Sequence, residues 1–224
     1  MPKRDVVLAN NEIYHLVNKG ITLQNVFISK RNLQRAVDTL FYYQNINIPC
    51  KYSKFIVQST ENRNGLIKEM RQKKEFLVEI ISYCLMPNHF HFLVKQVEDK
   101  GITKFVSNFT NSYTRYFNTI NDRHGPLFQG NFRAKRIEND EQLLHVSRYI
   151  HLNPFSSYLV KNFNELKKYE YSSFPEYLKT TKVDKCQKEI VLGQFKNHKK
   201  YIDFVFDRAD YQQTLENIKR LLSE

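Results

Sequence analysis

The sequence predicts an α+β fold in which helices cover an antiparallel sheet. Along the chain, the patterns run strand, helix, three strands, helix, a basic segment and a further helix. Two apolar runs, 76–85 and 89–95, are separated only by Met86-Pro87-Asn88. A Pro-Asn pair between apolar runs favours a turn. We therefore expect these two runs to pair as an antiparallel hairpin.

The elements before this hairpin follow from local patterns. Residues 12–18 read as a first strand. Ser29 can cap a helix that carries apolar residues at helical spacing, namely Leu33, Ala36, Val37 and Leu40. Residues 52–59 are expected to form a second strand. The polar, basic stretch from Asn62 to Lys74 predicts a loop or a short helix.

Two helices and a basic segment are expected after the hairpin. Residues 102–118 place aromatic and aliphatic side chains three or four apart, which predicts an amphipathic helix. Residues 127–138 read as an extended, basic segment. A helix over 140–153 then starts at a cap, Asn139 or Asp140, and we expect Pro154 to end it, because the residue before proline disfavours helical geometry.

The tail beyond about residue 160 is rich in lysine and more polar. It carries patterns for two helices, near 184–206 and 208–223. We therefore expect one domain over residues 1–178 and a basic, helical C-terminal extension over 179–224.

The composition favours a polyanionic partner. The formal net charge is +12 over 224 residues, which suits nucleic acid or an anionic membrane surface. No run approaches the ~18 apolar residues of a spanning helix, so the membrane is the weaker choice. Three widely spaced cysteines and no secretory signal predict a reduced, cytoplasmic setting. No G-x-x-x-x-G-K-[ST] loop is present, so no nucleotide cofactor is expected.

The most informative feature is the pair His89 and His91 within the run 83–94. Side chains alternate along a strand, so both imidazoles project from one face while Phe90 points to the other, towards a core. Imidazole is a common metal ligand. The pair alone suits either a metal chelate or two packed or surface histidines.

The predicted helix 140–153 offers partners for this pair. His145, Tyr149 and Asn153 recur every four residues and fall close to one face. Tyr149 and Asn153 each have an ordinary explanation, since tyrosines commonly pack in cores and asparagine before proline commonly ends a helix. Together with a two-histidine strand, however, Tyr149 could act as a nucleophile and Asn153 as a third metal ligand.

Four stretches resemble a known family when taken together. They are YHLVNKG at 14–20, MPNHFHFLV at 86–94, GPLFQGNFRAKRI at 125–137 and RYIHLNP at 148–154. In combination and order they resemble the single-tyrosine HUH transposases (insertion-sequence-200-like), and most of all the REP-associated tyrosine transposases. The likeness spans roughly residues 12–177. It implies the ferredoxin-like HUH endonuclease fold.

The resemblance implies an enzyme that cleaves and rejoins single-stranded DNA, at hairpin or palindromic repeats. Tyr149 would attack a phosphate and form a 5′-phosphotyrosine link. His89, His91 and Asn153 would hold Mg²⁺ or Mn²⁺. Contacts to DNA are expected from basic and amide residues: Arg133, Lys135, Arg136, Gln129, Lys73 and Lys74.

The sequence departs from the family in two places and leaves alternatives open. Asn153 stands where insertion-sequence relatives carry glutamine, and Asn131 stands where the family often has arginine. A protein that binds hairpins without cutting them, or a metal-dependent nuclease that uses water, are the alternative functions. A homodimer, with Tyr149 of one subunit beside the histidines of the other, also stays open.

Overall fold

The computed structural model describes residues 6–181 and 184–221, and it has the predicted α+β architecture. Its sheet has four strands in the order β2-β3-β1-β4, and every neighbouring pair is antiparallel. The strands are β1 (Ile13–Lys19), β2 (Val78–Met86), β3 (His89–Gln96) and β4 (Arg133–Arg136). The predicted hairpin is confirmed as β2 and β3, joined at Pro87-Asn88.

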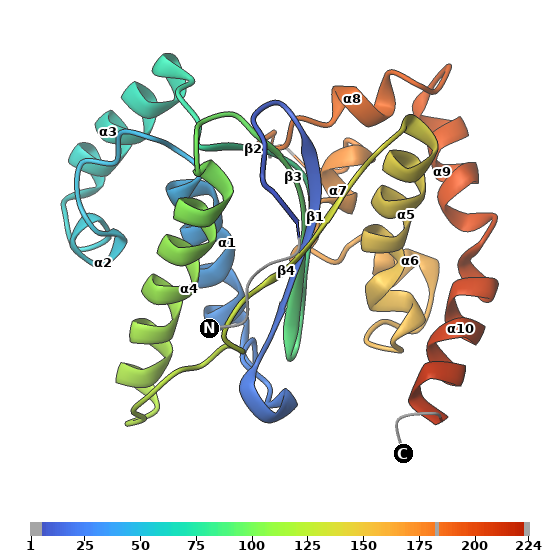
Figure 1. Ribbon diagram of the computed structural model, residues 1–224, viewed down its shortest axis with the longest axis horizontal. Helices are drawn as coiled ribbons and strands as arrows, with labels where there is room; N and C mark the ends of the chain where they lie inside the picture. Colours follow the sequence, from blue (N-terminus) through green and yellow to red (C-terminus); the bar gives the residue numbers. More distant parts are fainter. Residues whose placement is uncertain (1–5, 182–183, 222–224) are drawn as a thin grey trace.

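Helices cover both faces of this sheet (Figure 1). One face carries α1 (Lys30–Tyr43), α2 (Tyr52–Phe55), α3 (Thr60–Lys73) and α4 (Gly101–Ile120). The other carries α5 (Asp140–Ser156), α6 (Phe163–Leu166), α7 (Phe174–Tyr177), α8 (Glu189–Leu192), α9 (His198–Phe206) and α10 (Ala209–Leu221). A short 3₁₀ helix, Ile21–Leu23, follows β1.

The alternation of side chains along β3 separates two apolar cores. Phe90 and Phe92 lie in the core under α1 and α4, where Phe90 meets Phe109 edge-on. Leu93 lies in the second core, with Ile150 of α5. The histidines share the face of Leu93, so they point towards α5, as the predicted alternation requires.

The prediction of a strand over residues 52–59 is wrong. Residues 52–55 form α2, because Tyr52 and Phe55, three apart, both turn into the core under α1 and α4. Val57, which an alternating strand would bury with Phe55, is 80% exposed. The polar stretch that follows is longer and more regular than expected, since α3 runs from Thr60 to Lys73 and is capped by Ser59.

The end of α5 also differs from the prediction. Pro154 lies inside the helix, which continues to Ser156. Proline removes one backbone donor, but Pro154 and Ser156 are buried and the helix closes with a bond from Ser157 N–H to the Asn153 carbonyl. Its start is as predicted, with Asn139 as the cap that accepts from Gln142 N–H.

Two further ranges need correction. Only 133–136 of the expected extended segment 127–138 joins the sheet. The expected helix 184–206 is two helices, α8 and α9, since Asn197 caps a new start at His198. The expected helix 208–223 is α10, and residues 222–223 lie outside the described part of the chain.

The C-terminal helices share the core of α5 rather than standing apart. Tyr201 and Val205 of α9 and Ala209 of α10 are buried in the same apolar cluster as Leu143 and Ile150. A boundary near residue 178 stays a prediction. Among the described residues, no helix is long and apolar enough to cross a bilayer.

Candidate functional site

Tyr149 of α5 lies against the histidine face of the sheet. Its half-buried ring meets the His91 ring edge-on, with 5.4 Å between the ring centroids. The rings of His89 and His91 are 4.8 Å apart in the same way. A tyrosine ring and two imidazoles therefore meet on one face of the sheet.

A third histidine, His15 of β1, completes this cluster, and sequence reasoning missed it. Its Nε2 lies 3.0 Å from Nδ1 of His91, and its ring stacks on that of His91 with centroids 5.2 Å apart. The register explains the contact, because Val17 pairs with His91 and His15 lies two residues earlier on the same face. Pairing the strand 12–18 with the histidine strand would have revealed it.

A hydrogen bond indicates which nitrogen of His89 carries the proton. Nδ1 of His89 lies 2.6 Å from the side-chain oxygen of Asn88, so Nδ1 donates and Nε2 carries the lone pair. Nδ1 of His91 lies 3.0 Å from Nε2 of His15, and either ring can donate in that contact. When a histidine binds a metal, its other ring nitrogen commonly donates to a neighbour in this way.

Burial favours the neutral form of His89 and of His15. Burial, with a smaller effect from the positive charge of Lys19, lowers the pKa of His89 to about 4. It also lowers the pKa of His15 to about 4, with a smaller effect from Lys135. Neutral imidazole is the form that binds a cation, so His89 needs no deprotonation at pH 7.

Asn153 lies one helical turn beyond Tyr149 and is buried. Its Nδ2 donates to the backbone carbonyl of Tyr149 at 3.1 Å, which engages the nitrogen end of the amide, while the oxygen end is the part that can bind a cation. No three His, Cys, Asp or Glu side chains form a ligand group among the described residues. His89, His91 and the Asn153 amide oxygen are neutral groups, so a divalent ion held by these three would keep its charge and open coordination positions.

Helix α10 also contacts the helical turn that carries Tyr149. Nε2 of Gln212 donates to the Tyr149 carbonyl at 3.1 Å and to Oγ of Ser156 at 3.2 Å. The carbonyl of Tyr149 therefore accepts from both Gln212 and Asn153. The C-terminal segment, in which the sequence indicated only basic helices, thereby helps to hold the tyrosine in place.

Two of the predicted DNA-binding residues lie on the histidine face. In the register of β1 and β4, Arg133 pairs with Val17 and Lys135 pairs with His15, and directly paired residues project from the same face. Both side chains are exposed. Lys19, paired with His89 at the end of β1, adds a third cation that the sequence prediction did not include.

The other four predicted DNA-binding residues are not gathered at the site. Arg136 pairs with Tyr14, on the opposite face, and is bound to Glu12 at 2.6 Å. Lys73 and Lys74 end α3, across the sheet from α5 in Figure 1, and Lys73 pairs with Glu69. Gln129 is half-buried beside the end of β1, where its N–H donates to the Lys19 carbonyl.

The two histidines that flank Tyr149 in sequence bond to residues outside the histidine cluster. His145 accepts from the Arg148 guanidinium at 2.7 Å, and its ring contacts Phe204 of α9. His151 is fully buried between Tyr201, 2.6 Å from its Nδ1, and Ser173, 2.7 Å from its Nε2. The contacts of both histidines are structural.

Acid is expected to destabilise the protein through His151. Burial lowers the pKa of His151 to about 3, whereas an unfolded histidine titrates near 6.5. Between these values the unfolded chain binds a proton at this residue that the folded chain does not, so His151 alone makes stability fall by about 1.4 kcal/mol per pH unit below about pH 6.5, beside the contributions of His89 and His15. Urea unfolding between pH 6.5 and 4.5 measures this slope, and His151→Gln should lower it by about that amount.

The matched control is His124→Gln, which changes an exposed histidine and should leave the pH slope as in the wild type. Equal slopes for His151→Gln and the wild type would contradict the assignment to His151.

Comparisons with known proteins show the family and the fold. The family model described as "Transposase IS200 like" matches residues 38–153, just over half of the 224 residues. A solved REP-associated tyrosine transposase, bound to a REP hairpin, is similar in fold with a TM-score of 0.51 at 14% identity. The alignment covers 80% of this chain and 86% of the other. No curated protein is significantly similar in sequence.

Proposed function

Because the chain belongs to the IS200-like transposase family, we propose that it cleaves and rejoins single-stranded DNA through a covalent link to Tyr149. The observation that carries this proposal is the contact between the Tyr149 ring and His91, at 5.4 Å, on a face that also holds His89 and His15. Such a face combines a nucleophile with neutral metal-binding groups.

The proposed reaction has two balanced steps. The phenol oxygen of Tyr149 attacks the phosphorus and loses its proton to solvent, while the bond to the 3′-oxygen breaks. That oxygen leaves with a proton as a 3′-hydroxyl, and the 5′-phosphate stays on Tyr149. In the second step a 3′-hydroxyl attacks the phosphotyrosine, which restores the phenol and one phosphodiester. The number of phosphodiester-type bonds never changes, so no nucleotide cofactor is required.

His89, His91 and the Asn153 oxygen are the residues that would hold Mg²⁺ or Mn²⁺. A divalent ion bound there would act as a Lewis acid towards the attacked phosphate. Because all three ligands are neutral, they leave the positive charge undiminished for an anionic substrate. His15 keeps the His91 ring oriented through the 3.0 Å contact, and Gln212 holds the backbone at Tyr149.

Cationic side chains on the same face, two of them exposed and Lys19 half-buried, suit the phosphates of the strand. Arg133, Lys135 and Lys19 lie on the side of the sheet that carries the histidines. We propose hairpin DNA as the substrate, because the solved transposase of similar fold is bound to a REP hairpin. Binding through phosphates should weaken steeply as salt rises.

The test is a cleavage assay on labelled single-stranded hairpin DNA. With Mn²⁺ or Mg²⁺ we expect a protein–DNA band that survives a denaturing gel, and we expect EDTA to remove it. Cleavage without such a band would indicate hydrolysis by water. Binding without cleavage, over several hairpins and both metals, would indicate a protein that recognises DNA without cutting it.

A further inference from the structure

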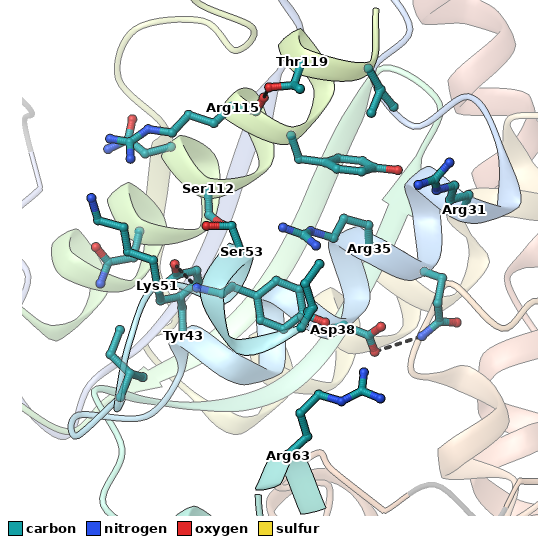
Figure 2. A pocket seen from close by; sticks show the side chains of 18 residues that line it. Arg31, Arg35, Asp38, Tyr43, Lys51, Ser53, Arg63, Ser112, Arg115 and Thr119 are labelled. Carbon is teal, nitrogen blue, oxygen red and sulfur yellow. Dashed lines mark hydrogen bonds between the residues drawn. The ribbon is translucent and has the colours of Figure 1, made fainter. Parts of the chain in front are cut away.

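A second candidate site lies across the sheet from Tyr149. Helices α1, α2 and α4, with the start of α3, line a partly open cavity of about 880 Å³ (Figure 2). Figure 1 places these helices on the face of the sheet opposite to α5. The volume is that of a pocket for a small organic ligand, roughly 300–1,000 Å³. The residues of the candidate active site do not line it.

The cavity is strongly basic. Five cationic side chains line it, against one carboxylate, Asp38. Among the described residues, none of the five lies in an ion pair. Asp38 is engaged by Gln34, whose amide donates to it at 2.9 Å, and burial raises the pKa of Asp38. The unbalanced cations are Arg31, Arg35, Lys51, Arg63 and Arg115.

Two of these arginines carry buried donors that the described protein groups do not satisfy. The Nε atoms of Arg35 and Arg63 are both buried without a hydrogen-bond partner there. The Arg35 guanidinium is held between two tyrosine rings, 4.4 Å from the centroid of Tyr52 and 4.9 Å from that of Tyr116. Buried arginine donors of this kind are normally matched by an acceptor, and the planar guanidinium favours phosphate.

Aromatic and amide side chains also line the cavity, so it suits a larger ligand than a simple anion. Tyr116 is half-buried, and its hydroxyl donates to Asn32 at 3.2 Å. Ile120, 43% exposed, lies one helical turn further along α4 at the same cavity. Asn108 and Asn111 bring side-chain donors and acceptors. Arginines with an aromatic surface and amides are the groups that hold a single-stranded nucleotide by its phosphate and its base.

We propose that this cavity binds one nucleotide of a single-stranded DNA segment, with the arginines on its phosphate and Tyr116 beside its base. The inference rests on the proposed function in that DNA is the ligand. It adds a second contact to the strand, on the far side of the sheet from the point of cleavage. The protein would therefore hold a segment that it does not cut.

The test is photocrosslinking with single-stranded and hairpin DNA that carries 5-iododeoxyuridine, in EDTA so that no strand is cleaved. Peptide mass spectrometry should find crosslinks at Tyr116 or Tyr52. The double variant Arg31→Ala/Arg115→Ala, which changes two exposed arginines, should lower these crosslinks at least 10-fold. It should also reduce the salt slope of binding by about 0.7, since the neutralisation of one phosphate is lost.

The matched control is Lys199→Ala/Lys200→Ala, which removes the same charge from exposed positions on α9 and should leave the crosslinks unchanged. An equal loss of crosslinks in both double variants would overturn the proposal that the cavity binds DNA, because the loss would then reflect net charge alone. A free deoxynucleotide monophosphate that binds the cavity while DNA gives no crosslink there would overturn the assignment to a strand.

The two proposals fail separately. If a Tyr149 adduct forms but no crosslinks appear in the cavity, the proposed DNA contact at the cavity is overturned and the proposed function remains. Pocket crosslinks without any adduct support the pocket and overturn the chemistry proposed for Tyr149. Absence of both overturns both proposals.

Discussion

Tyr149→Phe is expected to abolish the covalent protein–DNA adduct, with a loss of about 10⁴-fold or more. The substitution removes one oxygen and keeps the ring, so the edge-on contact with His91 at 5.4 Å is retained. The helix should keep its place as well, because Gln212 and Asn153 bond to the backbone carbonyl of residue 149 and not to its side chain. The loss would therefore report the nucleophile and not the fold.

The measurement is the denaturing gel with labelled hairpin DNA, together with thermal unfolding to check the fold. Tyr211→Phe is the matched control, since it removes the same oxygen from a tyrosine that is 60% exposed on α10. An adduct that persists in Tyr149→Phe would assign the nucleophile to another residue. Strand cleavage that persists without an adduct would assign the attack to water.

The features that the sequence predicted well depend on short-range patterns. The turn at Pro87-Asn88 and the alternation from His89 to Val94 identified the hairpin and its two faces, and the structure confirms both. The cap at Ser29 is also confirmed, since its side chain accepts from Asn32 N–H. Each of these signals lies within a few residues, where spacing alone decides which face a side chain takes.

The features that the sequence analysis missed depend on contacts between residues that are distant in the sequence. His15 joins the site only because β1 pairs with β3, which brings it 3.0 Å from His91 across 76 residues of sequence. Gln212 contacts Tyr149 from a helix for which the sequence indicated only helical, basic character. Pro154 stays inside α5 because the last turn of the helix is buried. Local helix propensity does not account for the effect of such burial.

The predicted strand at 52–59 fails for a related reason. A short apolar run fits a strand or a helix equally well, and neighbouring elements decide between them. Here the Tyr52 N–H donates to the Tyr43 hydroxyl at 3.1 Å, and the Tyr52 ring packs on Tyr42 and Phe55. The run thus joins the helical layer that forms the second cavity, and the strand prediction would have removed that cavity altogether.

Loss of the metal ligands should be the second large effect, and it separates the roles of His91 and His15. We expect His91→Ala to lower Mn²⁺ affinity at least 100-fold, because it removes a direct ligand. We expect His15→Ala to lower it by about 10- to 100-fold, because it removes the group that orients the His91 ring. Titration followed by Mn²⁺ electron paramagnetic resonance, without DNA, measures both.

The conservative change His15→Gln distinguishes orientation from ligation. A glutamine amide offers both a donor and an acceptor, so it can bond to Nδ1 of His91 in place of Nε2 of His15, and part of the affinity should return relative to His15→Ala. Tyr149→Phe and the exposed His124→Ala should both bind Mn²⁺ as the wild type does. Unchanged affinity in His91→Ala would contradict the proposed ligand set. Affinity that falls equally in His91→Ala, His15→Ala and His15→Gln would instead make His15 a ligand in its own right, and the site would then hold its ion with three imidazoles.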